Sequence, residues 1–273
     1  MLSTTTPWHT QNFVRHPGRI ERLLDLTTVT ADDVVLDLGA GHGELTAPLA
    51  RRCRRVVAVE KDPLLARGLS MRFAEQPGVQ VRWADALAVR LPRGPYKVVA
   101  NVPFDITARL VRRLTSAAYP PVDSYLVVQR EAALRLTGPT LLGNQLKPWF
   151  APTIIHAFKR TDFAPPPRVD VVFLRLRKRG PPLAHDRALY CMLLARCFGA
   201  PTMLQALRPL FGRTGSLRIA RDTGFSAHAG AARLSFEQWL ALYSNVTTRR
   251  LIWRAAGSTI MRPARWPPSR RQA

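Results

Sequence analysis

Lysine, cysteine and long apolar stretches are all scarce in this chain of 273 residues. The three cysteines (Cys53, Cys191, Cys197) form no CxxC pair and have no histidine at zinc-ligand spacing, so we expect free thiols in a reducing compartment and no metal site. No stretch approaches the roughly 20 apolar residues of a membrane span, and residues 1–15 contain no signal-peptide core. We therefore expect a cytoplasmic protein without a membrane partner.

Acidic residues are also few, because 18 Asp and Glu face 41 Lys and Arg, for a net charge of +23 and a pI of about 11.5. Five of the basic residues are lysines, so arginine dominates. An arginine-rich genome would explain arginine over lysine, but not the excess of positive over negative charge. Phosphate neutralisation supplies most sequence-independent affinity for nucleic acid. The charge therefore favours a nucleic-acid partner over an anionic membrane surface.

Short apolar runs alternate with helical patterns from residue 34 onward, which is typical of a parallel sheet with crossover helices. The expected strands are 34–38, 56–60, 79–83, 97–101 and 124–128, and the expected helices between them are 44–54, 63–75 and 106–117. Two further runs, 153–158 and 169–176, lie too close together for a helix and predict an antiparallel hairpin at the sheet edge. The sequence therefore predicts an α/β, Rossmann-like sheet of seven strands.

A basic segment with two prolines at 177–182 interrupts every periodicity and predicts a linker. Only helical patterns follow it, at 186–198, 201–210, 216–223 and 235–243. We expect a Rossmann-like domain over 1–178 and a small all-helical RNA-binding domain over 179–248. The Arg/Pro-rich tail, 249–273, is expected to be disordered when free.

Three glycines follow the first expected strand, in Asp37-Leu38-Gly39-Ala40-Gly41-His42-Gly43, and would let the backbone turn sharply beside a ligand. A dinucleotide-binding fingerprint would need glycine where the chain has Glu44. The shorter loop, through Gly39 and Gly41, instead favours the methionine tail and ribose of S-adenosylmethionine (SAM). A tight strand–helix turn without a ligand is the alternative.

Acidic residues end the next two expected strands. Glu60 lies 21 residues after Gly39 and could accept both ribose hydroxyls, and Asp85 could accept the amine of the cofactor adenine. The alternatives are a surface carboxylate paired with Lys61 for Glu60 and a helix N-cap for Asp85. Because three successive strand ends carry a suitable group, cofactor binding is the better interpretation.

The fourth strand ends in Asn101-Val102-Pro103-Phe104, at the carboxyl edge where ligands of open α/β sheets bind. The side-chain carbonyl of Asn101 and the backbone carbonyl of Val102 could accept the two N–H bonds of an adenine N6 amine. Pro103 would stiffen the turn and Phe104 would stack on the base. An ordinary strand-ending turn is the alternative, but the position 16 residues after Asp85 favours a target-base site.

These motifs occur in the order seen in rRNA adenine N6 dimethyltransferases, and the chain resembles that group over residues 9 to about 178. Gln129-Arg130-Glu131-Ala132-Ala133 and Leu146-Lys147-Pro148-Trp149-Phe150 resemble the Erm 23S rRNA methyltransferases of macrolide resistance. The resemblance implies SAM as the cofactor, with Gln11 and Asn12 closing over it. It also implies that Phe163 forms the second face of a base sandwich, for which a loop-anchoring core aromatic is the alternative. The family usually has tyrosine at the position of Phe104, so monomethylation could dominate over dimethylation.

Basic residues near the catalytic edge are expected to clamp the RNA backbone around a base splayed out of its context. They are Arg109, Arg112, Arg113, Arg130, Arg135 and Arg168. The first three are expected on one face of the helix that follows the catalytic loop. A solvated basic face without a ligand is the alternative.

The sequence therefore predicts a monomeric, metal-free enzyme that transfers one or two methyl groups from SAM to N6 of an adenine. The expected substrate is 23S rRNA before full ribosome assembly, and the expected effect is macrolide–lincosamide–streptogramin B resistance. The alternatives are housekeeping methylation of small-subunit (16S) rRNA and a non-catalytic rRNA-binding factor on the same fold. A nicotinamide dehydrogenase is disfavoured by Glu44 and by the lack of a hydride-transfer acid.

Overall fold

The computed structural model describes residues 13, 14 and 17–255. The chain divides into two compact units, one comprising Met1–Thr137 with Phe150–Gly180 and the other Gly138–Trp149 with Pro181–Ala273. The chain therefore passes between the units three times. No helix within the described ranges is long and apolar enough to cross a membrane. The same residues contain no cluster of three His, Cys, Asp or Glu side chains that could hold a metal ion.

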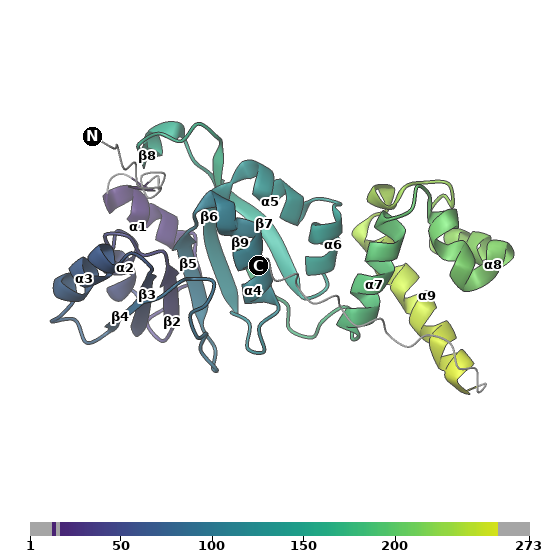
Figure 1. Cartoon of the computed structure of the whole chain (residues 1–273), viewed down its shortest axis with the longest axis horizontal. Coiled ribbons are helices and arrows are strands. Elements are labelled where there is room, and N and C mark those ends of the chain that lie inside the picture. Colours follow the sequence, from purple (N-terminus) through teal and green to yellow (C-terminus); the bar gives the residue numbers. More distant parts are fainter. Residues whose placement is uncertain (1–12, 15–16, 256–273) are drawn as a thin grey trace, which may run out of the picture. The chain divides into compact units, whose positions relative to one another are not determined.

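A seven-stranded sheet forms the centre of the first unit, in the order β4-β3-β2-β5-β6-β9-β7 (Figure 1). Its strands are β2 (Val34–Leu38), β3 (Arg55–Glu60), β4 (Val79–Trp83), β5 (Lys97–Asn101), β6 (Asp123–Gln129), β7 (Phe150–Ala157) and β9 (Val171–Lys178). The first five are parallel, and β9 runs antiparallel to both β6 and β7. This confirms the expected Rossmann-like α/β sheet with an antiparallel edge.

Helices cover the sheet because each carries one apolar face. They are α1 (Pro17–Asp25), α2 (Thr46–Ala50), α3 (Pro63–Arg72), α4 (Thr107–Thr115) and α5 (Arg130–Thr137), with short 3₁₀ turns η2 (Phe104–Ile106) and η3 (Arg160–Asp162). Leu24 of α1 and Leu49 of α2 are buried in one cluster with Val35 and Val56 of the sheet. A separate two-stranded ladder pairs β1 (Phe13–Val14) with β8 (Phe163–Ala164).

The second unit is helical and has its own core. Its helices are α6 (Leu141–Leu146), α7 (Arg187–Phe198), α8 (Met203–Asp222) and α9 (Phe236–Ala255), with the 3₁₀ turn η4 (Ala231–Arg233). Tyr190, Ile219 and Trp239 are fully buried at its centre. Trp149 joins this core through an edge-on contact with Tyr190, with ring centroids 5.7 Å apart. Part of the Erm-like segment 146–150 therefore anchors α6 in the helical unit.

Three boundaries differ from those expected. Residues 138–149 pack with the helical unit rather than with the domain expected over 1–178, because Leu141 and Trp149 join its core. The two helices expected at 201–210 and 216–223 both form, one on each side of a break at Gly212, where φ is +66°, but together they extend over Met203–Asp222 without the gap expected at 211–215, and the label α8 covers both. Helix α9 continues to Ala255, so the first residues of the expected tail are helical, and 256–273 lie outside the described residues.

One ion pair ties the antiparallel edge to the parallel part of the sheet. Arg175 of β9 donates from Nε and Nη2 to the two carboxylate oxygens of Asp123 on β6, at 2.9 and 2.7 Å. The Asp123 side chain is only 5% exposed, and it also accepts a hydrogen bond from the Thr28 hydroxyl at 3.1 Å. Two-point pairing in a buried setting fixes both side chains.

We expect Asp123→Ala to lower the free energy of unfolding by about 3 kcal/mol, because it leaves the partly buried Arg175 guanidinium uncompensated. Urea titration followed by circular dichroism measures the change. Glu131→Ala is the matched control, since it breaks an exposed pair with Arg135 and should cost less than about 1 kcal/mol. Equal losses in the two variants would contradict the structural role of the Asp123–Arg175 pair.

Candidate active site at the carboxyl edge of the sheet

The register of the parallel strands brings the predicted motifs to one edge. Glu60 lies opposite Trp83 in the β3–β4 ladder, and Leu38, which precedes the glycine loop, lies opposite Val59. Gly39 also faces the end of β5, because a Cβ atom built on Gly39 would lie 3.7 Å from the backbone oxygen of Asn101 and 4.0 Å from Cδ of Pro103. The structure therefore places the glycine loop beside the Asn101–Phe104 segment.

The glycine loop is made by left-handed backbone that a side chain would oppose. Gly39, Gly41 and Gly43 have φ values of +82°, +58° and +89°. A Cβ on Gly43 would also come within 2.8 Å of the Phe73 ring. Gly39 and Ala40 donate backbone hydrogen bonds to the carbonyl of Val59, at 2.8 and 3.1 Å. These hydrogen bonds hold the glycine loop against the end of β3, so its backbone lies at the carboxyl edge of the sheet.

Glu60 is buried, with 2% exposure, which excludes the alternative of a surface carboxylate. One carboxylate oxygen accepts the Gly41 N–H at 3.0 Å, and the other accepts the N–H groups of Lys61 and Asp62 at 2.8 and 2.9 Å. A carboxylate offers roughly four acceptor positions, so three are used by the backbone. Glu60 could therefore accept a hydrogen bond from one ribose hydroxyl while keeping all three backbone donors. A second hydroxyl would have to replace one of them.

Asp85 is exposed, and it combines the two interpretations offered by its sequence. Its Oδ1 accepts the Leu87 N–H at 2.7 Å, as a turn-capping side chain does. Its backbone carbonyl accepts hydrogen bonds from Ala88 and Val89, at 2.9 and 2.8 Å. Because the side chain is exposed at the end of β4, the carboxylate can cap its own turn and still face a ligand.

Arg113 differs from its predicted role. It was expected to share an RNA-facing helix surface with Arg109 and Arg112, but its guanidinium turns to the segment after Asp85. There Nη1 donates to the Ala86 carbonyl at 2.9 Å and Nη2 donates to the Val89 carbonyl. Burial lowers the pKa of this guanidinium below its ordinary value. Arg113 thus holds the Asp85 turn to α4, the helix that follows the target-base loop.

Asp37 was quoted in the sequence only as the start of the glycine motif, yet it has the most unusual environment at this edge. Its side chain is fully buried, and Oδ2 accepts the Thr46 hydroxyl at 2.7 Å. Oδ1 has no hydrogen-bond partner among the described residues. Burial, opposed by the Thr46 hydrogen bond and reinforced by Glu44 and Glu60, raises the pKa of Asp37 to about 7. The acid directly preceding the glycines was the signal that could have identified it.

The target-base residues form a continuous turn out of β5. Val102 is buried and its N–H donates to the Val127 carbonyl at 3.2 Å, while Pro103 caps the 3₁₀ turn that begins at Phe104. Phe104 is partly buried and packs against the apolar cluster that contains Phe163. Phe163 itself is 2% exposed and lies edge-on to Phe158, with centroids 5.2 Å apart. In this structure Phe163 thus anchors its loop, and Phe104 has the more accessible ring.

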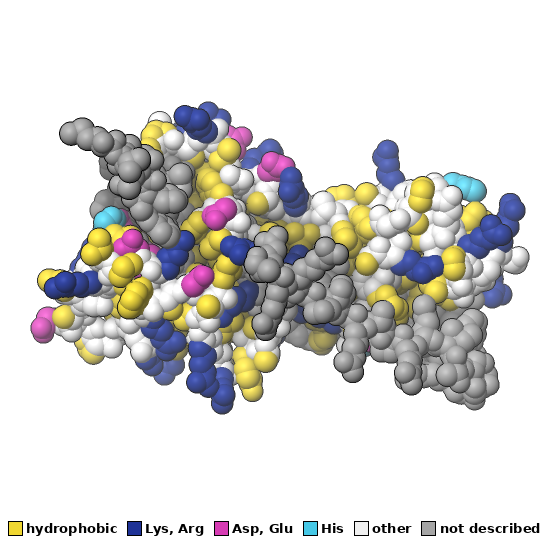
Figure 2. Space-filling view, viewed as in Figure 1, with side chains coloured by type: hydrophobic (Ala, Val, Ile, Leu, Met, Phe, Trp, Pro, Cys, Tyr) yellow, Lys and Arg dark blue, Asp and Glu magenta, His cyan; other side chains and the backbone are white. Residues whose placement is uncertain are grey.

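The remaining basic residues expected to bind RNA are exposed. Arg109 and Arg112 lie on the outer side of α4, Arg130 and Arg135 on α5, and Arg168 between β8 and β9. Arg135 pairs with Glu131 one helical turn away, which reduces its availability. Figure 2 shows Lys and Arg side chains spread over the visible face, with few Asp and Glu among them. Gln11 and Asn12 lie outside the described residues.

These features fit SAM. The glycine loop leaves room for a ligand beside Glu60, and the carboxylates of Glu60 and Asp85 could accept hydrogen bonds from the hydroxyl and amine groups that SAM carries. Glu60, Asp85 and the loop through Gly39 and Gly41 would hold the cofactor, which supplies an electrophilic methyl group.

Comparisons with known proteins agree with this geometry. The chain matches the family "Ribosomal RNA adenine dimethylase" over residues 4–246. It is 33% identical to an rRNA adenine N-6-methyltransferase of Streptomyces fradiae, over 90% of this chain and 80% of that protein. It is 35% identical to the mycinamicin-resistance protein MyrB of Micromonospora griseorubida, over 66% of this chain and 58% of that one. Among solved structures it resembles the 23S rRNA methyltransferase ErmE, with 30% identity, a TM-score of 0.79 and coverage of 86% of this chain and 100% of ErmE.

The raised pKa of Asp37 predicts a specific pH dependence. The folded state favours the protonated carboxyl, so the wild type loses stability as pH rises from about 4, where the unfolded chain ionises, to about 7, where the folded chain does. We expect Asp37→Asn, which stays neutral, to gain stability relative to wild type over that interval and no further above it. Urea unfolding of both proteins between pH 4 and pH 8 measures the difference. A difference that does not change with pH would contradict the buried, protonated state.

The position of Arg113 predicts that it affects SAM binding, whereas Arg112 on the same helix does not. We expect Arg113→Gln to weaken SAM binding about 10-fold, because two charge-assisted hydrogen bonds no longer hold the Asp85 turn. RNA affinity should change little. Arg112→Gln is the matched control on the same helix and should leave SAM binding unchanged. Titration calorimetry with SAM and filter binding with RNA test both. If Arg113→Gln reduced RNA affinity while sparing SAM, Arg113 would belong to the RNA-facing surface after all.

Proposed function

Because the chain belongs to the ribosomal RNA adenine dimethylase family, it is an enzyme that uses SAM to methylate N6 of an rRNA adenine, and we propose that its substrate is 23S rRNA. The observation that carries this proposal is the likeness to the 23S rRNA methyltransferase ErmE. We further propose that the modification confers macrolide–lincosamide–streptogramin B resistance, and the relative MyrB, named a mycinamicin-resistance protein, supports a role in antibiotic resistance.

We assign the target base to the turn that leaves β5. An adenine N6 amine is a weak nucleophile because its lone pair is delocalised into the ring. The side-chain carbonyl of Asn101 and the backbone carbonyl of Val102 accept its two N–H bonds and shift electron density onto nitrogen. Bound SAM would supply the electrophilic methyl group for this nitrogen, and the proton displaced from N6 would leave to solvent. Pro103 fixes the direction of the turn.

Phe104 is the stacking partner in this proposal, because base–aromatic stacking contributes roughly 1–3 kcal/mol. Phe163 becomes a second stacking face only if the short β1–β8 ladder shifts, since its ring is buried against Phe158. That ladder directly follows Gln11 and Asn12, the residues proposed to close over SAM. Because Phe104 has no hydroxyl to orient an already methylated base, we propose monomethyladenosine as the main product.

Arg109, Arg112, Arg130, Arg135 and Arg168 are proposed to hold the RNA backbone around the extruded base. Their exposure and charge support this role, as does the large positive charge of the whole chain. The helical unit is proposed to add RNA contacts. We propose that the enzyme acts as a monomer before ribosome assembly is complete, when a target adenine can still be splayed out of its RNA context.

Expression in a macrolide-sensitive bacterium tests the function. We expect raised macrolide resistance, with N6-methyladenosine mapped by mass spectrometry to 23S rRNA. Asn101→Ala is the inactive control, and its turnover should fall roughly 100-fold, the effect of losing one hydrogen-bonding group matched to the transition state. Its SAM and RNA affinities should remain.

Two outcomes would overturn parts of the proposal. Methyl groups found in 16S rRNA and not in 23S rRNA would assign the enzyme to small-subunit rRNA. Loss of RNA binding in Asn101→Ala, together with loss of turnover, would show Asn101 to be a structural residue rather than the group that activates the amine.

A further inference from the structure

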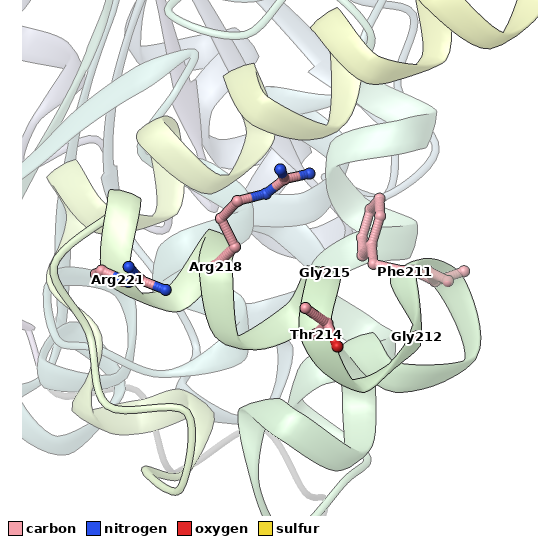
Figure 3. Close-up of a pocket in the computed structure, with 7 residues that line it drawn as sticks. Phe211, Gly212, Thr214, Gly215, Arg218 and Arg221 are labelled. Atoms are coloured by element: carbon pink, nitrogen blue, oxygen red, sulfur yellow. The ribbon is translucent and has the colours of Figure 1, made fainter.

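Helix α8 carries a pocket that the methyl-transfer site does not use. The helix breaks at Gly212, which adopts φ +66° and ψ 175°, so its two halves do not continue each other. Leu210 and Phe211 line the pocket before the break, and Thr214, Gly215, Arg218 and Arg221 line it after the break (Figure 3). The pocket has a volume of about 630 Å³. The backbone break thus lies at a hollow on the exposed side of α8.

The pocket wall is positively charged, and within the described part of the chain its charges have no partner. Helix α8 contains four arginines, Arg208, Arg213, Arg218 and Arg221, and one acidic residue, Asp222. All five side chains are exposed. The guanidinium groups of Arg218 and Arg221 form no ion pair or hydrogen bond with any described residue, including Asp222. Two free guanidinium groups one turn apart suit a phosphate, which arginine binds through paired donors.

An aromatic ring completes the lining. Phe211 is only partly buried and packs on one side against the core of the helical unit. Figure 3 shows its ring and the Arg218 side chain extending to the same side of α8. No side chain fills the space over Gly212, because a Cβ built there would meet no atom within 4 Å. A flat ring beside free arginines is the combination that binds unpaired nucleotides.

We propose that this pocket binds one unpaired nucleotide of the rRNA substrate. Its phosphate lies between Arg218 and Arg221, and its base lies against Phe211, with the bare Gly212 backbone allowing close approach. The inference rests on the chain being an rRNA methyltransferase, but not on which rRNA it modifies. The helical unit thereby recognises a single-stranded feature of the RNA apart from the methylated base.

The test compares arginines on the same helix. Arg218→Gln with Arg221→Gln removes the phosphate ligands, and Phe211→Leu removes the flat face while keeping an apolar side chain. Arg213→Gln is the matched control, an exposed arginine of α8 that does not line the pocket. Each full-length protein is titrated with 16S and 23S rRNA transcripts over a range of salt concentrations.

For the transcript that wild type methylates, we expect the double variant to bind about 10-fold more weakly. The slope of log affinity against log salt concentration should decrease by about one to two, because fewer counterions are released on binding. Phe211→Leu should bind about 5-fold more weakly with an unchanged salt dependence, because stacking involves no counterion release. SAM affinity should match wild type in all variants, and the melting temperature should match wild type in the arginine variants, while Phe211→Leu should lower it by a few degrees at most because Phe211 packs on the core. An effect of the double variant no larger than that of Arg213→Gln would overturn the phosphate assignment, and full affinity in Phe211→Leu would overturn the base assignment.

These outcomes are separate from those of the proposed function. If wild type methylates 16S rRNA only, the 23S proposal fails while the pocket is still tested on the 16S transcript. If wild type methylates 23S rRNA and the pocket variants bind it unchanged, the pocket proposal alone fails. A 4-thiouridine-substituted transcript gives a direct readout, since its photocrosslink should map to the peptide 210–221. Crosslinks confined to other peptides would overturn the proposal.

Discussion

The carboxylate of Glu60 is the interaction on which the cofactor edge depends. A parallel sheet brings strand ends together, but it does not determine the path of the loops that leave them. Glu60 does so, because one oxygen holds the Gly41 N–H of the glycine loop and the other holds the turn after β3. Its burial makes these hydrogen bonds strong and their loss costly. Glu60, which the sequence predicted only as a ribose contact, therefore also determines the path of the glycine loop.

The Asn101–Phe104 segment and the helix after it are linked to the glycine loop and the Asp85 turn by a backbone approach and by one arginine side chain. Gly39 lies against the Asn101 carbonyl and Pro103, so the two loops touch where they leave adjacent strands. Arg113 makes a second link. It lies on α4, the helix after the Asn101–Phe104 segment, and donates hydrogen bonds to the segment after Asp85. Methyl transfer needs the donor and acceptor atoms aligned within a few tenths of an ångström. Two links between these segments would limit their relative movement in the proposed site.

The sheet and the strand-end residues could be predicted because apolar runs and glycine motifs are local patterns. The direction of Arg113 could not, since a helical repeat shows which residues share a face but not which carbonyls lie opposite. The burial of Asp37 and Phe163 also depends on packing between distant segments. The same holds for residues 138–149, where no helix was expected and where nothing in the local sequence indicated that Trp149 would pack on Tyr190. Local sequence patterns predicted which residue types lie at the ends of the strands. Tertiary contacts determine which of those side chains are exposed.

The three passages of the chain between the units constrain how such proteins can recombine. A crossover placed after β9, where the sequence suggests a clean linker, would exchange α7, α8 and α9 but leave α6 behind. Leu141 and Trp149 would then meet a core that evolved with different partners. The residues that follow β9 therefore do not contain the whole helical unit. Changes in the core formed by α7, α8 and α9 must be matched by changes in residues 138–149, so these two segments are expected to diverge together.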